Sequence, residues 1–406
     1  MTAPEDVRAA VDAAYRDEWG QVVATLIGLT GDWDLAEDCV QDAFAAALAT
    51  WARDGIPARP GAWLTTTARH RATDRLRRVT TGAAALRQLA VLERDPIARE
   101  DRAEIPDERL RLIFTCCHPA LPFPARVALT LRTLTGLSTG EIAKAFLTAE
   151  PTMAQRLVRA KRKIVEAGIP YRVPPAELLP QRLTAVLAVL YLIFNEGYDE
   201  EDGRRALAAE GIHLARTLVR LMPTEPEARG LLALMLLLEA RRANRTDDGV
   251  LVTLENQDRS QWDRALIAEG VATLDEALAV RRSGPYQVQA AIAACHATAP
   301  DAAATDWPQI AALYAALTRL APSPVVDLNR AVAIAMADGI PAGLAIVDEL
   351  AESGKLDGYY LLPATRADLL RRDGRRAEAA TSYEEALELA PTDAERRYLT
   401  GRLSEL

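Results

Sequence analysis

The sequence predicts an all-α protein in which two small helical domains precede a larger domain of helical hairpins. Ala, Leu, Arg and Glu dominate the composition and aromatic residues make up only 5%, a mixture that favours helices over strands. Apolar residues recur at three- and four-residue spacing along most of the chain, as they do on one face of a helix. A chain of 406 residues is too long for one core, which favours roughly two to four domains.

The first domain is predicted over residues 1–79. An apolar stripe begins at Val7 and ends before Asp32, which, like Asp34, has the side chain to cap the next helix. A third helix is predicted over Ala62–Arg78, because Pro and Gly stand immediately before it.

A polar stretch, residues 80–106, is interpreted as a linker to a second domain over residues 107–169. Here a helix is predicted over Ser138–Ala145, with its first residue as cap and Glu141 at capping-box spacing. A short turn leads to a second helix over Pro151–Glu166, so the pair forms a helix-turn-helix pattern. Its inward face is predicted to contain Met153, Leu157, Ala160 and Ile164.

Four prolines between Gly168 and Pro180 mark the strongest domain boundary, and residues 170–180 are interpreted as a second linker. The remaining part, residues 181–406, is predicted to be helical throughout. Its best internal repeat covers residues 357–391 and matches the 34-residue tetratricopeptide pattern. The matching positions are Ala367, Ala379, Tyr383, Ala386 and Pro391.

Charge is distributed unevenly along the chain. The net charge is −9, but residues 1–175 hold 24 basic against 22 acidic side chains, and the remainder holds 24 against 35. Two basic stretches, Arg69–Arg78 and Arg156–Lys163, each contain five basic residues. They suit contacts with nucleic-acid phosphates, although composition alone favours two solvated helix faces.

The four cysteines form no CxxC pair, and Cys116-Cys117-His118 has no second ligand pair at metal spacing. We therefore expect buried thiols, no metal and no cofactor. The longest apolar runs, Leu183–Phe194 and Leu231–Leu238, are shorter than the roughly 18 residues of a membrane span. The charged N-terminus is not a signal peptide, so we expect a cytoplasmic protein without a membrane partner.

Three segments in the right order resemble the extracytoplasmic-function sigma factors of bacterial RNA polymerase. Asp34–Phe44 (DLAEDCVQDAF) resembles the region 2 helix that docks on the polymerase, and Pro60–Arg78 resembles the reader of the −10 element. Leu137–Ile164 resembles the region 4 helix-turn-helix without a gap. Each motif alone is weak, but together they are specific. The resemblance implies core RNA polymerase and promoter DNA as partners.

The resemblance also implies site residues. An acidic cluster suited to a basic partner surface, and expected on one exposed helix face, would bind polymerase; it comprises Glu37, Asp38, Gln41 and Asp42. The region 2 residues expected at DNA are Trp63, Arg69, His70, Arg71, Arg75, Arg77 and Arg78. In region 4, Arg156 and Arg159 are expected to reach bases, with Thr152 and Gln155 beside them. Lys161, Arg162 and Lys163 are expected to hold the DNA backbone.

The chain departs from the family pattern at His70, Ala154 and Leu147, which suggests an altered promoter preference. The extension resembles the subgroup with a C-terminal tetratricopeptide-type domain, implying a regulatory or partner-binding module. Just beyond the boundary, Asn195, Glu196 and Asp199–Asp202 are interpreted as helix-end and turn residues in preference to a metal site.

Two other classes of function are alternatives to a sigma factor. A tetratricopeptide-type scaffold with a different DNA-binding role would lack polymerase binding. An enzyme would need an acid or base among His70, His118, His213 and His296, but no nucleophile elbow, phosphate loop or zinc spacing accompanies them. We therefore expect no enzymatic activity.

Overall fold

The computed structural model describes residues 4–79, 108–146, 148–198, 205–247 and 249–406. The predicted linker at 80–106 and the acidic turn Asp199–Asp202 lie outside the described residues, as does Leu147. The chain divides into two compact units, Met1–Leu214 and Ala215–Leu406.

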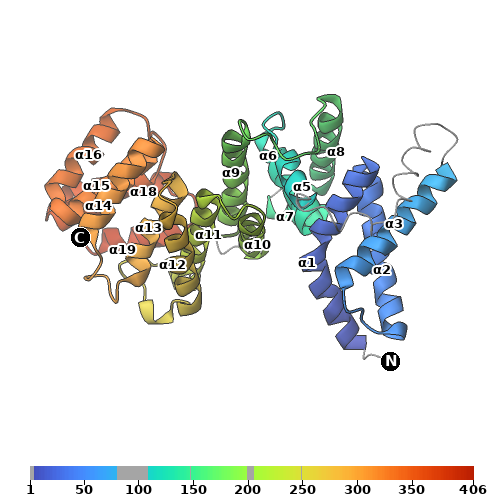
Figure 1. Cartoon of the computed structure of the whole chain (residues 1–406). Helices are drawn as coiled ribbons and strands as arrows, with labels where there is room; N and C mark the ends of the chain where they lie inside the picture. The colour runs from blue at the N-terminus through green and yellow to red at the C-terminus, as the bar shows by residue number, and fades with distance from the viewer. Residues whose placement is uncertain (1–3, 80–107, 147, 199–204, 248) are drawn as a thin grey trace. The chain divides into compact units, whose positions relative to one another are not determined.

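Helices build both units, which confirms the all-α fold (Figure 1). Within the described residues, strand structure is limited to one antiparallel pair, β1 (Thr246–Asp247) and β2 (Val250–Leu251). The helices of the first unit are α1 (Pro4–Thr30), α2 (Trp33–Asp54), α3 (Pro60–Val79), α5 (Glu108–Cys116), α6 (Phe123–Thr130), the π-helical turn η2 (Leu131–Thr135), α7 (Thr139–Ala145), α8 (Glu150–Glu166), α9 (Leu179–Tyr198) and the first part of α10 (Arg205–Leu221).

The helices α1, α2 and α3 pack against one another around a common apolar core. Asp32, one of the two predicted caps, starts α2, because its carboxylate accepts hydrogen bonds from two backbone N–H groups of the first turn. Gly55, at φ 89°, ends that helix in a conformation that favours glycine. Trp19 and Trp51 are fully buried between these helices. These three helices lie within residues 1–79, the predicted first domain.

The predicted helix-turn-helix is formed by α7 and α8. Ser138 and Glu141 make the expected reciprocal capping box at the start of α7. The second helix begins at Glu150, one residue before the predicted start, with Pro151 in its first turn. The four side chains predicted to face inward are all buried: Met153, Leu157, Ala160 and Ile164.

The helix that follows the proline-rich stretch packs with the first unit. Arg182 at the start of α9 donates a hydrogen bond to the Phe114 carbonyl of α5, at 3.3 Å, and α9 packs on both α5 and α6. Its buried face contains Leu183, Val186, Leu187 and Leu190. The compact unit therefore continues past the predicted boundary and ends inside α10.

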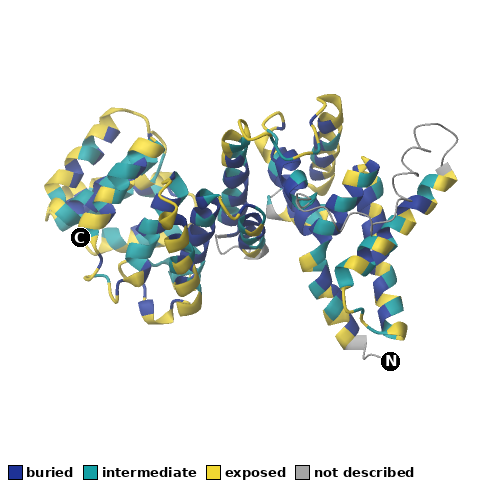
Figure 2. Cartoon of the chain, in the orientation of Figure 1, coloured by how far each residue is buried: buried dark blue, intermediate teal, exposed yellow. Residues whose placement is uncertain are grey.

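The second unit is a series of antiparallel helix pairs with buried faces turned inward (Figure 2). Its helices are α11 (Pro226–Glu239), α12 (Arg264–Ala279), α13 (Pro285–Thr298), α14 (Trp307–Leu320), α15 (Pro324–Asp338), α16 (Ile340–Glu352), α17 (Leu361–Arg372), α18 (Arg376–Leu389) and α19 (Asp393–Ser404), with short 3-10 turns η3 (Arg242–Asn244) and η4 (Arg259–Gln261). The predicted repeat is the pair α17 and α18, and its signature positions Ala367, Ala379, Tyr383 and Ala386 are buried.

Candidate polymerase and nucleic-acid interfaces

The acidic face of α2 and the basic face of α3 meet at Arg75. Its guanidinium lies 2.9 Å from Asp38 Oδ2 and 2.7 Å from Asp42 Oδ2. Gln41, between them in the sequence, is exposed. The structure thus brings two residues expected at polymerase, Asp38 and Asp42, into contact with one expected at DNA, Arg75.

Glu37 is not on an exposed helix face, as its acidic neighbours in the sequence predict, but is buried. Its side chain is only 7% exposed and forms ion pairs with Arg132 of η2, at 3.0 Å, and Lys161 of α8, at 2.8 Å. Because a buried carboxylate is stable only when it is paired, these cations fix its position. Sequence reasoning missed Arg132, since no local pattern marks it as a partner for a residue in another domain.

The predicted −10 reader is α3. His70, Arg71, Arg77 and Arg78 are exposed along this helix, where cations can approach phosphates. Arg69 is half-buried. Trp63 is also half-buried, and its ring packs edge-on against Trp51, with 5.6 Å between centroids. One side of the Trp63 ring therefore packs in the core. The predicted stacking on DNA could involve only the other side of the ring.

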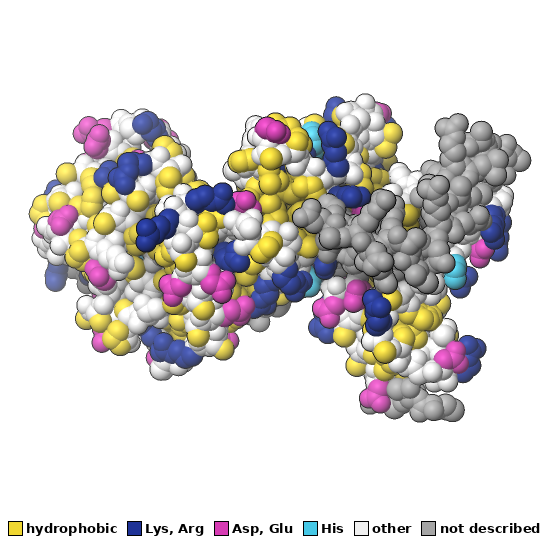
Figure 3. All heavy atoms as spheres, in the orientation of Figure 1, with side chains coloured by type: hydrophobic (Ala, Val, Ile, Leu, Met, Phe, Trp, Pro, Cys, Tyr) yellow, Lys and Arg dark blue, Asp and Glu magenta, His cyan; other side chains and the backbone are white. Residues whose placement is uncertain are grey.

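The recognition helix α8 borders a groove of about 550 Å³ between itself and the start of α6. Figure 3 shows Lys and Arg side chains over the part of the surface that α8 occupies in Figure 1. Pro122 and Pro124 form the opposite wall. The lining includes six residues expected at DNA: Thr152, Gln155, Arg156, Arg159, Arg162 and Lys163.

Lys161 lies away from this groove. Its ammonium group is 2.8 Å from both Asp34 Oδ1 and Glu37 Oε1, and its side chain is 14% exposed. Burial alone would lower the pKa of Lys161, but the two carboxylates raise it above its ordinary value, so the lysine stays charged. In this arrangement Lys161 contacts region 2 and not the surface that the other basic residues share.

The neighbouring Cys116 and Cys117 are buried thiols, as predicted. Cys116 Sγ lies 3.3 Å from Thr133 Oγ1, and Cys117 Sγ lies 3.6 Å from Thr130 Oγ1. Burial raises the pKa of Cys117 to about 11 and that of Cys116 further. In the part of the chain that the structure describes, no group of three His, Cys, Asp or Glu side chains is placed to hold a metal ion.

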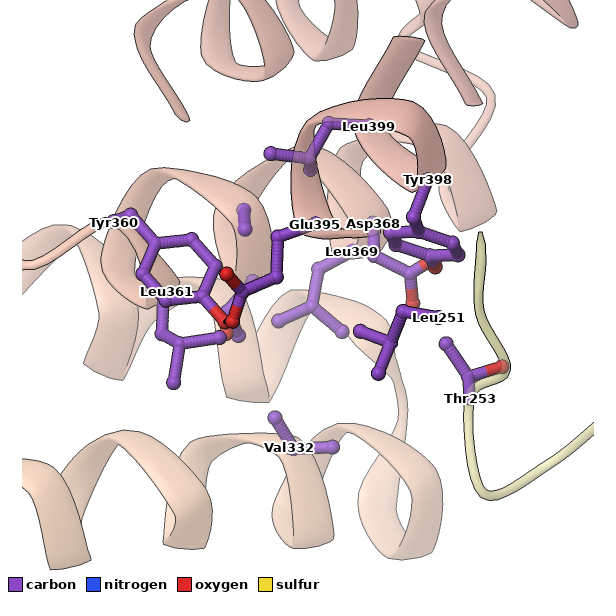
Figure 4. A pocket seen from close by; sticks show the side chains of 12 residues that line it. Leu251, Thr253, Val332, Tyr360, Leu361, Asp368, Leu369, Glu395, Tyr398 and Leu399 are labelled. Carbon is purple, nitrogen blue, oxygen red and sulfur yellow. The ribbon is translucent and has the colours of Figure 1, made fainter. Parts of the chain in front are cut away.

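The second unit contains a cavity of about 220 Å³ between α15, α17, α19 and the strand β2 (Figure 4). Tyr360 donates a hydrogen bond of 2.7 Å to Glu395 at its edge. Asp368 lies in its wall, and the ion pairs with Arg371 and Arg372 hold the pKa of that carboxyl below its ordinary value although burial opposes this. A second cavity of about 490 Å³ shares Asp368 and contains His296.

Comparison with known proteins agrees with the two N-terminal domains. Residues 14–81 match the model for sigma-70 region 2, and residues 111–164 match sigma-70 region 4. Residues 182–278 match a family of unknown function, DUF6596. A protein of Rhizobium meliloti (strain 1021), itself described as uncharacterized, is 43% identical and covers 98% of this chain and 96% of its own. No solved structure matches the chain.

The helical bundle, the helix-turn-helix and these matches define a sigma factor with a role in promoter recognition. The chain belongs to the sigma-70 family, with the region 2 and region 4 arrangement of extracytoplasmic-function sigma factors and an additional C-terminal domain. Families of this kind are transcription factors and not enzymes. None of the described helices is long and apolar enough to cross a membrane.

Proposed function

We propose that this sigma factor binds core RNA polymerase through α2 and directs initiation by reading a −10 element with α3 and a −35 element with α8. The observation that carries the proposal is the exposed basic face of α8, the second helix of a helix-turn-helix. A helix in this position enters the major groove. Arg156 and Arg159 line its groove together with Lys163.

The basic residues of α8 are proposed to have two roles, contact with bases and contact with phosphates. Arginine can donate two hydrogen bonds to one guanine edge, so Arg156 and Arg159 are the proposed base readers. Arg162 and Lys163, nearer the end of the helix and exposed, are proposed to contact phosphates. Lys161 is proposed to contact phosphates only after its ion pairs with Asp34 and Glu37 are broken.

On α2, exposure favours Asp38, Gln41 and Asp42 as the polymerase contacts. A basic partner surface would compete with Arg75 for the two aspartates. Glu37 is proposed to act in the same surface, but its carboxylate becomes accessible only when Arg132 and Lys161 move. A polymerase partner also implies a cytoplasmic protein.

For the C-terminal extension we propose a tetratricopeptide-type module that binds a protein partner and is required for transcription. The packing of α17 on α18 around small buried residues supports the repeat type. The cavity beside Tyr360 and Tyr398 offers apolar surface with a few polar groups, as peptide and ligand sites commonly do. Repeat surfaces of this kind usually bind partners.

The test is co-purification of the full chain with core RNA polymerase, followed by transcription from promoters selected with the reconstituted holoenzyme. We expect a stable complex and initiation at a defined promoter. A chain that binds DNA but no polymerase would contradict the proposal and favour the scaffold alternative.

A further inference from the structure

The larger cavity of the second unit, of about 490 Å³, lies between α13, α14, α15, α17 and the segment that joins α11 to α12. Its wall shares Val332, Asp368 and Leu369 with the smaller cavity, where Figure 4 labels them. A volume of this size is within the usual range of small-molecule sites. We call this space the Arg259 cavity, after the buried arginine in its wall.

Arg259 is a buried cation without a carboxylate partner. Only 6% of the residue is exposed. Its Nη1 donates hydrogen bonds to the carbonyls of His296 and Ala299, at 2.7 and 2.9 Å, and its Nη2 donates to Thr305 Oγ1 at 3.1 Å. Among the residues that the structure describes, no carboxylate lies within ion-pair distance of this guanidinium. Asp301 is exposed, and its charge acts on Arg259 without an ion pair.

These bonds leave one edge of the guanidinium unused. A guanidinium has five N–H groups, and the bonds of Arg259 occupy Nη1 and one hydrogen of Nη2. Its Nε is buried and has no hydrogen-bond partner among the described residues. Nε and Nη2 form one edge of the planar fork, which can bond both oxygens of a carboxylate. Because a buried donor without an acceptor costs stability, this edge is suited to an anion.

A structural role at the end of α13 explains only the Nη1 contacts. The carbonyls of His296 and Ala299 lie at the C-terminal end of that helix, where the helix dipole favours a cation. This role requires neither the Nε–Nη2 edge nor a cavity beside it. The Trp262 ring lies against the guanidinium, with 5.1 Å from its centroid to the Arg259 Cζ atom. That contact helps to fix the orientation of the fork.

Much of the remaining wall is apolar. Leu254, Val332 and Met336 contribute apolar side chains. The indole of Trp307 packs edge-on against the ring of His296, with 5.3 Å between centroids. Such a wall suits the apolar body of a ligand more than a free inorganic anion.

The other titratable groups of the wall leave the charge of Arg259 uncompensated. The carboxylates of Glu255 and Asp368 both form ion pairs with Arg372. Burial lowers the pKa of His296 to about 4, so this ring carries no charge at neutral pH. The cation available to a ligand in this cavity is therefore Arg259.

We propose that the Arg259 cavity binds a small organic carboxylate. Its carboxylate group bonds the Nε–Nη2 edge of Arg259, and its apolar body contacts Val332, Met336 and Trp307. A free small molecule suits the site better than a segment of a partner protein, because the buried arginine is reached only from inside the cavity. This site does not depend on the proposed sigma activity, since it is built entirely within the second unit.

Benzoate is a suitable probe, and benzyl alcohol is its neutral counterpart of similar size. Saturation-transfer NMR on the full chain measures both without polymerase or DNA. We expect saturable benzoate binding with a Kd on the order of 1 mM and much weaker binding of benzyl alcohol. Equal binding of the two probes, or no saturable benzoate binding up to about 10 mM, would overturn the proposal.

The substitution Arg259→Met removes the cation and should weaken benzoate binding by about tenfold or more. Its control is Arg319→Met, an exposed arginine of α14 that lines neither cavity. Circular dichroism checks that both variants keep their helicity. Unchanged benzoate affinity in Arg259→Met would contradict the assignment of the anion site.

A second pair of variants decides the question if Arg259→Met does not fold. Val332 is half-buried in the cavity wall, and its replacement leaves Arg259 and its hydrogen bonds in place. Val332→Glu adds a carboxylate that repels benzoate and competes for the arginine. Val332→Gln adds the same volume without the charge. We expect Val332→Glu to bind benzoate several-fold more weakly than Val332→Gln, and equal affinities would overturn the site.

Discussion

Arg75 of α3 lies 2.7 Å from Asp42 of α2 and thereby links the predicted promoter surface to the predicted polymerase surface. The same guanidinium reaches Asp38 at 2.9 Å. Both aspartates are substantially exposed, so the ion pairs themselves contribute little to stability. The ion pairs matter for binding instead, because Arg75 and a basic surface of the polymerase would compete for the same two carboxylates.

We predict that the double substitution Asp38→Asn and Asp42→Asn weakens core polymerase binding, because it removes two charges that a basic surface would contact. The fold should remain intact, as neither residue is buried. Affinity is measured by titration of labelled core polymerase. Asn is preferable to Lys here, because lysines would repel Arg75.

The companion variant Arg75→Gln separates the two roles. It leaves both carboxylates free for polymerase but removes a cation from the promoter surface, so core binding should persist while promoter binding falls. If Arg75→Gln weakens core binding as strongly as the double aspartate change, the assignment of α2 to polymerase is wrong.

In region 4, Arg159→Ala should lower affinity mainly for promoters with the preferred base at one position of the −35 element, by about 1–3 kcal/mol. Lys163→Ala should weaken binding to all sequences about equally and reduce the dependence of affinity on salt. Binding to a panel of single-base promoter variants at several salt concentrations distinguishes the two.

The control for region 4 is Val158→Ala, on the same helix, exposed and outside the set of expected DNA contacts. It should change neither preference nor salt dependence. Uniform losses for both Arg159→Ala and Lys163→Ala would contradict the division between base readers and phosphate contacts.

Truncation tests the role of the extension, and the structure decides where to cut. A chain ending at Ala176 loses α9, so the apolar surface of α5 and α6 beneath Leu183 and Leu187 would be exposed. Each such side chain contributes roughly 1.5–3 kcal/mol of burial. We predict that residues 1–176 have a lower free energy of unfolding than residues 1–221, which retain α9 and α10. Urea denaturation followed by circular dichroism measures this.

Residues 1–221 are then the informative variant for function. If the extension is a required module, this variant should bind core polymerase but fail to initiate transcription. Constitutive or increased transcription would refute that role and identify the extension as an inhibitor.

Glu210 of α10 gives a pH-dependent prediction. Burial raises the pKa of this carboxyl to about 7, with only partial relief from Arg16. The folded state therefore holds a proton that the unfolded chain releases near pH 4.5. The contribution of the protonated Glu210 carboxyl to the free energy of unfolding is therefore fully present below pH 4.5. It is lost as the pH rises from 4.5 towards 7.

The substitution Glu210→Gln should accordingly stabilise the first unit at pH 8, by up to roughly 3 kcal/mol, and much less at pH 5. Urea unfolding of the two proteins across this range measures the difference, with the exposed Glu352→Gln of α16 as control. If Glu210→Gln stabilises the protein equally at pH 5 and pH 8, the raised pKa of Glu210 is wrong.

Local patterns predicted most of the fold. Asp32 and Ser138 were recognisable as helix caps because capping depends on residues within one turn. The inward face of α8 followed from its 3.6-residue period, and the burial of Ala379 and Tyr383 followed from the repeat spacing. These features require no knowledge of distant residues.

Long-range pairing could not be predicted in the same way. Glu37 resembled its exposed acidic neighbours, and only the fold shows that Lys161 and Arg132 bury it. The prolines after Gly168 indicated a domain boundary. They interrupt the chain between α8 and α9, but α9 still packs on α5 and α6 of the same compact unit. Where α9 packs depends on an apolar surface contributed by α5 and α6, which no pattern near Leu183 reveals.

The packing of α9 on region 4 also bears on protein engineering and on descent. A chimaera that grafts the extension onto another sigma factor at the proline-rich stretch would leave Leu183 and Val186 without their complementary surface. The transferable module is instead the helix-turn-helix together with α9. A lineage that acquired such an extension had to adapt the outer surface of α5 and α6 along with it, so these two surfaces should change in concert among its descendants.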